Sequence, residues 1–173
     1  MDMQRRIRAD LSRLARREKA EVLSRFFRTG KGEYGEGDYF LGVTVPEQRK
    51  IAKKYHRLSL RGVDALLASR THEHRLVALL ILIEKYRNAE DTARGDIVAF
   101  YLERTGRINN WDLVDLSAEK VLGDYLSGRD KSILYRLAAS NSLWERRIAI
   151  MATFAFIRKG RFEDTLALSG LLL

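Results

Sequence analysis

The sequence predicts an all-α protein, built as an α-solenoid of repeated helix pairs. Apolar residues recur along the chain at the three- and four-residue spacing of amphipathic helices. The alternation typical of strands is scarce, and the 173 residues include a single proline. Short and long helical segments also alternate, which is the pattern of an α-α superhelix.

The N-terminal part predicts helix, then loop. Helical periodicity runs over residues 3–27, with a break near residues 16–18, where the apolar phase is lost. Residues 29–38 hold four glycines and are expected to form a loop.

Capping residues mark the helices that follow. Thr44 and Glu47 have the spacing of a capping box, and Pro46 suits the first turn of a helix that reaches residue 55. Ser59 begins the next helix, and Asn110 is placed to cap a long helix that ends near Gly128. The same periodicity predicts helices over residues 73–86, 92–103, 132–139 and 143–159.

Two helix pairs resemble one another in sequence. Residues 66–69 (LLAS) lead into 73–78 (EHRLVA), and residues 137–140 (LAAS) lead into 145–150 (ERRIAI) with one residue inserted. If Arg75, Asp115 and Arg147 hold comparable early-helix positions, the separations are 40 and 32 residues. A period of roughly 35–45 residues is typical of HEAT and armadillo solenoids, whose second helices line a concave face.

Length and composition narrow the class of protein. The chain is long enough for one domain over residues 1–173. It shows neither a membrane-spanning run nor an apolar block after its N-terminal charges, so a membrane protein and a secretory signal are not expected. The absence of cysteine excludes disulfides and thiolate sites, and it suits a reducing cytoplasm.

The charge is strongly basic. Lys and Arg number 32 against 23 acids, for a net charge of +9, and 23 of the basic residues are Arg. Arginine pairs with phosphate through two parallel hydrogen bonds, so the balance indicates a nucleic-acid binder. The alternative is a basic protein without such a partner.

Two residues could carry chemistry at the start of the helix after Asn110. Trp111 and Asp115 share one helical face, and Asp115 falls at the edge of the apolar stripe. A carboxylate there could stabilise the positive sugar that forms when an N-glycosidic bond breaks, or hold the attacking water. The alternatives are an ion pair for Asp115 and core packing for Trp111. Asp112 is interpreted as a helix-capping residue, because an acid in the first turn interacts favourably with the helix dipole.

Further basic residues are candidates for phosphate contact. Arg49 and Lys53 lie four residues apart on one helical face, and the alternative is a solvated surface. Arg146 and Arg147 are adjacent, so at most one of them can face a groove squarely. Arg75 begins another of the predicted groove-lining helices.

Several site classes find no support in the sequence. The three histidines lack the spacing of metal ligands, and there is no phosphate-binding glycine loop or nucleophile elbow. We therefore expect neither a metal nor another cofactor.

Segments 32–55, 109–126 and 143–166 together resemble the DNA alkylation repair (AlkC/AlkD) family of HEAT-like-repeat DNA glycosylases. The likeness runs from about residue 18 to 165, and its most specific motifs are W-D-x-V-D and W-x-x-R. The resemblance implies excision of N3- and N7-alkylated purines from duplex DNA without a metal. It matches Asp115 to the catalytic carboxylate, Trp111 to a residue that lines the lesion site and Arg147 to a contact with the DNA backbone. Phe26 matches a DNA-facing aromatic that is usually Tyr.

The resemblance also has a departure. Family members usually continue for some tens of residues with further helices, so the apolar end ALSGLLL is interpreted as a helix cut short. Two other functions stay open, namely a non-catalytic nucleic-acid-binding scaffold and a protein-interaction solenoid. A monomer is expected, because one concave face can hold duplex DNA without a twofold partner.

Overall fold

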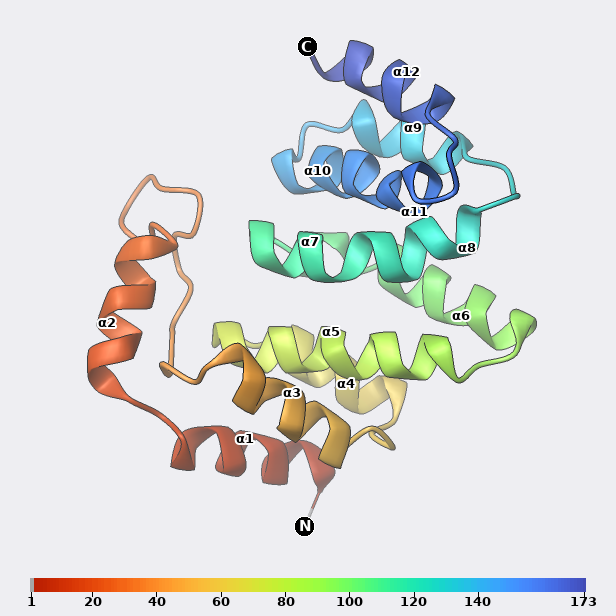
Figure 1. Cartoon of the computed structure of the whole chain (residues 1–173). Helices are drawn as coiled ribbons and strands as arrows, with labels where there is room; N and C mark the ends of the chain where they lie inside the picture. The colour runs from red at the N-terminus through yellow and green to blue at the C-terminus, as the bar shows by residue number, and fades with distance from the viewer. Residues whose placement is uncertain (1) are drawn as a thin grey trace. The chain divides into compact units, whose positions relative to one another are not determined.

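The computed structural model describes residues 2–173, and this part of the chain is all-α (Figure 1). It contains no β-strand within that range, and a single isolated bridge joins Tyr39 to Thr71. None of the described helices is both long and apolar enough to cross a membrane. The all-α class is therefore confirmed, and the solenoid arrangement stays a prediction.

The contacts divide the chain into two compact units, Met1–Lys85 and Tyr86–Leu173. This division does not test whether residues 1–173 form a single domain, which stays a prediction. The described residues of the first unit form five helices, of which the last extends two residues beyond the unit: α1 (Met3–Arg13), α2 (Arg17–Phe26), α3 (Val45–Lys54), α4 (Leu60–Leu67) and α5 (His72–Arg87).

Local sequence signals determine where the helices of the first unit begin. Thr44 and Glu47 form the predicted capping box at the start of α3, and Ser59 Oγ accepts the Gly62 N–H at 3.2 Å at the start of α4. The break between α1 and α2 lies at residues 14–16, where the Arg16 N–H donates to the Leu41 carbonyl at 2.8 Å. α1 packs on α3 and α4 through its buried Ile7 and Leu11, whereas α2 has no fully buried residue.

The second unit is built around α10 (Leu143–Ala152), which contacts α7, α9 and α12 (Figure 1). Its core contains Ile108, Val114, Leu122 and Ile148, all 0% exposed. The other elements of this unit are α6 (Asp91–Leu102), η1 (Thr105–Arg107), α7 (Trp111–Ala118), η2 (Glu119–Gly123), α8 (Asp124–Leu126), α9 (Ser132–Ala138), α11 (Phe154–Ile157) and α12 (Glu163–Leu172).

Two predicted helices of this unit are less regular than their sequence patterns suggested. The helix after Asn110 contains a π-helical turn, η2, and there a β-carbon on Gly123 would lie 2.1 Å from the Ala152 carbonyl oxygen. The predicted helix over residues 143–159 is interrupted at Thr153, whose hydroxyl donates to the Ile150 carbonyl at 2.7 Å. The first irregularity accompanies a close backbone approach and the second a local side-chain hydrogen bond to the backbone, and apolar periodicity encodes neither.

Candidate nucleic-acid interface

Three of the helices that carry predicted site residues begin in a similar way. Thr71, Asn110 and Ser142 immediately precede α5, α7 and α10. Asn110 Oδ1 accepts the Trp111 N–H at 2.8 Å, and Ser142 Oγ accepts the Glu145 N–H at 3.4 Å. These preceding residues are 39 and 32 positions apart, so they support a repeat of helix pairs.

The structural register of this repeat differs by one residue from the register expected from the sequence. Arg75 Nη1 donates to the Ser69 carbonyl at 3.1 Å, and Arg146 Nη1 donates to the Ser140 carbonyl at 2.8 Å. Arg75 therefore corresponds to Arg146, and the expected match of Arg75 with Arg147 is wrong. One more residue separates Ser140 from Glu145 than separates Ser69 from Glu73. An alignment of the similar sequences is therefore one position away from the alignment of the two backbone turns.

The corrected register places Asp115 and Arg147 at equivalent positions, each five residues after the residue that precedes its helix. Their side chains meet as a two-point ion pair. Arg147 Nε donates to Asp115 Oδ1 at 2.8 Å, and Arg147 Nη2 donates to Oδ2 at 2.7 Å. The ion pair that the sequence left as an alternative for Asp115 is thus present.

This pair remains accessible to solvent and to a ligand. The Asp115 side chain is 29% exposed and the Arg147 side chain 38% exposed. The hydrogen bond from Arg147 to Asp115 is the main reason why the pKa of the Arg147 guanidinium is raised, so this group stays cationic. A planar fork of this kind matches a phosphate as well as a carboxylate, because both present two oxygens at similar spacing.

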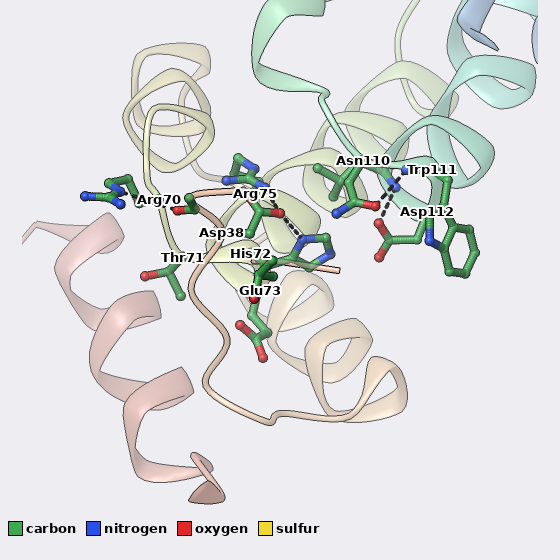
Figure 2. A network of polar contacts seen from close by, with 12 residues as sticks. Asp38, Arg70, Thr71, His72, Glu73, Arg75, Asn110, Trp111 and Asp112 are labelled. Carbon is green, nitrogen blue, oxygen red and sulfur yellow. Dashed lines mark hydrogen bonds and ion pairs between the residues drawn. The ribbon is translucent and has the colours of Figure 1, made fainter. Parts of the chain in front are cut away.

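Trp111 and Asp112 begin the helix that carries Asp115, and both are half-buried. Asp112 Oδ1 accepts the Leu113 N–H at 2.8 Å, which agrees with a role in satisfying the first helical turn. Figure 2 shows the Trp111 indole directed away from the Asn110 side chain. The sequence pattern therefore brings an indole and a paired carboxylate to one helix end.

A family model described as DNA alkylation repair enzyme matches residues 7–173. The chain belongs to the DNA alkylation repair enzyme family. This match confirms the resemblance indicated by the two Trp-containing motifs. A comparison with curated proteins gave no match.

Arg75 was expected to meet DNA in this repair protein, and its position argues against that role. It is 4% exposed, and its Nη2 donates to both Asp38 carboxylate oxygens at 2.7 Å (Figure 2). His72 Nδ1 lies 3.1 Å from the same carboxylate. Burial raises the pKa of Asp38, but the hydrogen bond from His72 and the charge of Arg75 outweigh it, so the pKa is lowered. Arg75 is therefore a buried structural cation, and a phosphate would have to displace Asp38 to reach it.

Glu73, next to His72 in Figure 2, fixes the chain that leads into α3. Its carboxylate is 1% exposed and accepts the N–H groups of three consecutive residues, Leu41, Gly42 and Val43, at 2.8 to 3.3 Å. A buried carboxylate satisfied in this way holds the loop rigidly against α5. In this repair protein the acid–basic pattern at the start of α5 is therefore structural.

The end of α2 and the loop after it present aromatic rings at the surface of the first unit. Phe26 is 61% exposed, and the Tyr34 hydroxyl donates to the Phe26 carbonyl at 3.4 Å. Tyr39, which the sequence reasoning missed, is also 61% exposed and borders a cavity of about 820 Å³ together with Arg17 and Arg25. No helical or strand periodicity marks Tyr39, because it lies in a loop held by tertiary hydrogen bonds.

The other basic candidates differ in accessibility. Arg49 and Lys53 are exposed on α3, four residues apart. Arg146 is half-buried and engaged with the Ser140 carbonyl, so it is less accessible than the two residues of α3. Within residues 2–173, no group of three or more His, Asp or Glu side chains could hold a metal ion.

Proposed function

We propose that this protein is a DNA glycosylase that hydrolyses the N-glycosidic bond of N3- and N7-alkylated purines in duplex DNA. Asp115 is the catalytic carboxylate, Trp111 borders the lesion and Arg147 contacts a backbone phosphate. The protein acts as a monomer in the cytoplasm and uses neither a metal nor another cofactor.

The accessible ion pair of Asp115 and Arg147 carries this proposal. A free carboxylate would repel the phosphates of DNA, whereas a carboxylate paired with Arg147 can remain in a basic interface. When a phosphate binds the Arg147 guanidinium in place of Asp115, the Asp115 carboxylate becomes available to stabilise positive charge on the sugar. The N–O distances of 2.8 and 2.7 Å show that the two side chains are in contact, which supports a role for both at one nucleotide.

The proposed reaction needs little acid catalysis. An N7-alkylated purine carries a positive charge, and it accepts the bonding electron pair as the bond to C1′ breaks, so the base leaves neutral. The positive charge that develops on the sugar is stabilised by Asp115. A water oxygen then bonds to C1′, and its proton passes to Asp115 and on to solvent.

The remaining candidates position the DNA. Arg49 and Lys53 are exposed cations suited to phosphates away from the lesion, and each contact of this kind makes binding more sensitive to salt. Phe26 offers an exposed ring for packing against a sugar or a base. Arg146 contributes charge while it remains bound to the Ser140 carbonyl.

The test is release of N7-methylguanine and N3-methyladenine from methylated duplex DNA. The wild type is expected to release both bases, and Asp115→Asn is expected to bind the same DNA but release neither. Asp112→Asn is the matched control, because it removes a half-buried carboxylate from the same helix and retains an oxygen that can accept the Leu113 N–H. Equal activity in Asp115→Asn and the wild type would refute the catalytic role.

A non-catalytic scaffold for nucleic acid is the second candidate, because the same ion pair gives Asp115 a structural partner. If Asp115 serves only to hold Arg147, then wild type and Asp115→Asn bind DNA and neither releases a base. A protein-interaction module differs from both, because its partner binding lacks the steep salt dependence of phosphate contacts.

A further inference from the structure

A second cavity, of about 310 Å³, lies within the second unit. The end of α5, α6, the stretch from η2 to α8 and the region of α11 line it. Trp111 and Asp115 do not line it, since they lie near the beginning of the helical run that η2 and α8 complete. This cavity, here called the cationic pocket, is separate from the candidate DNA interface.

Positive charge dominates the cationic pocket. Its lining contains five cationic side chains against two carboxylates, an excess of three positive charges: Arg87, Arg94, Lys120, Arg158 and Lys159 against Glu119 and Asp124. Like charges on one lining repel one another, and a bound anion offsets that repulsion.

The two carboxylates already have partners within the pocket. Glu119 forms an ion pair with Arg158 at 2.5 Å, and Asp124 accepts the Tyr86 hydroxyl at 2.9 Å. Lys159 Nζ donates to the Ser127 hydroxyl at 2.9 Å, which is a neutral group and leaves the ammonium charge in place. The lining therefore carries more positive than negative charge.

The surrounding backbone fixes the geometry of the cluster. The Arg94 guanidinium donates from Nε to the carbonyls of Tyr86 and Ala89 at 3.2 and 3.0 Å, and it lies 5.0 Å from the centre of the Tyr86 ring. Gly123 in the π-helical turn allows the Ala152 backbone to approach, and α11 packs against η2. Such a turn is frequent at functional sites.

We propose that the cationic pocket binds a small phosphoanhydride anion, such as inorganic pyrophosphate or the diphosphate group of a nucleotide. The volume is near the lower limit of small-ligand pockets, which suits an anion of this size. Arginine and lysine on several sides supply the charge-assisted hydrogen bonds that phosphate oxygens accept. This site takes its ligand independently of the alkylated DNA.

Calorimetric titration at constant ionic strength tests the proposal, with pyrophosphate, a nucleoside diphosphate and sulfate as ligands. Tighter binding of the nucleoside diphosphate than of pyrophosphate identifies a nucleotide site, and the reverse order identifies a site for the inorganic anion. The double variant Lys120→Gln/Lys159→Gln is expected to lose at least about tenfold in affinity for either ligand. Arg5→Gln/Arg6→Gln removes the same charge from exposed positions on α1, and its affinity should stay within about twofold.

Backbone NMR shifts supply a second measurement on the full chain. Pyrophosphate is expected to shift the amides of residues 119–124 and 158–159, and to leave those of residues 111–115 unchanged. Equal weakening in both double variants, sulfate binding as tight as pyrophosphate binding, or shifts centred elsewhere would overturn the proposal. So would binding of single-stranded DNA, but not of pyrophosphate, through Lys120 and Lys159. Asp115→Asn should bind pyrophosphate as the wild type does, so the outcome is separable from glycosylase activity.

Discussion

Asp115 and Arg147 occupy equivalent positions in α7 and α10, five residues after the residue that precedes each helix, and they face one another as a two-point ion pair. The similar starts of α7 and α10 therefore bring the two residues of the candidate site together. The first helix supplies a carboxylate and the second a guanidinium at the same position. Because both side chains are partly exposed, the pair can exchange partners with a ligand at little cost in packing.

Replacing Arg147 should weaken DNA binding more than it weakens the fold. Arg147→Gln removes a phosphate partner, so affinity for duplex DNA should fall by about tenfold. The slope of log K against log salt should become shallower by about one. The free energy of unfolding should change by less than about 1 kcal/mol, because both side chains of the ion pair are partly exposed to solvent.

Fluorescence anisotropy over a range of NaCl concentrations measures both binding quantities. Arg136→Gln, at an exposed position on α9, is the control for the loss of one charge. An unchanged slope in Arg147→Gln would show that Arg147 makes no phosphate contact.

Arg75 and Arg49 should behave in opposite ways. Arg75→Gln leaves the buried Asp38 carboxylate without its main cation, and loss of one partner from such a pair costs about 3–5 kcal/mol of stability. Arg49→Gln should leave the thermal midpoint nearly unchanged and weaken DNA binding, because Arg49 is exposed. A stable Arg75→Gln protein with impaired DNA binding would restore Arg75 to the interface.

The helices could be predicted from the sequence wherever local signals decide the outcome. The capping box at Thr44 and Glu47 and the cap at Asn110 are contacts within one turn, so the sequence contains all their participants. The π-helical turn at Glu119–Gly123 was not predicted, because the backbone of Ala152, distant in sequence, approaches Gly123. Contacts of this kind become visible only when the helices are packed.

For the candidate site too, local relationships could be predicted from the sequence and contacts between distant segments could not. The spacing of Trp111 and Asp115 places them on one helix, and this needs no tertiary information. The sequence did not predict that Arg147 pairs with Asp115 or that Arg75 is buried against Asp38. Both contacts depend on packing between segments more than 30 residues apart. The sequence left both readings of Asp115 open, and its ion pair is compatible with both.

Gly123 should not tolerate a side chain. Gly123→Ala places a β-carbon 2.1 Å from the Ala152 carbonyl oxygen, so the backbone must shift, and the expected loss of stability is about 1–3 kcal/mol. Gly106→Ala is the control, because no atom lies within 4 Å of its added carbon. Urea denaturation of both variants measures the difference. Equal stability would show that η2 and the end of α10 can move apart without loss.

Protonation of His74 should destabilise the protein in mildly acidic solution. Burial, together with the charges of Arg8 and Arg75, lowers the pKa of His74 from 6.5 to about 4. The unfolded chain thus binds a proton at higher pH than the folded chain does. The contribution of neutral His74 to the free energy of unfolding is fully present above pH 6.5. It is lost as the pH falls from 6.5 through about 4, by roughly 3 kcal/mol in all.

The structure gives the reason for this sign. His74 Nδ1 is 2.8 Å from the Ser69 hydroxyl, and Nε2 is buried without a hydrogen-bond partner among the described residues. A second ring proton would be buried without an acceptor, beside two arginines. Denaturant titrations at several pH values should therefore show a steeper loss of stability between pH 6.5 and 4 in the wild type than in His74→Gln. Parallel curves would mean that His74 opens to solvent before it is protonated, because an exposed imidazole titrates alike in both states.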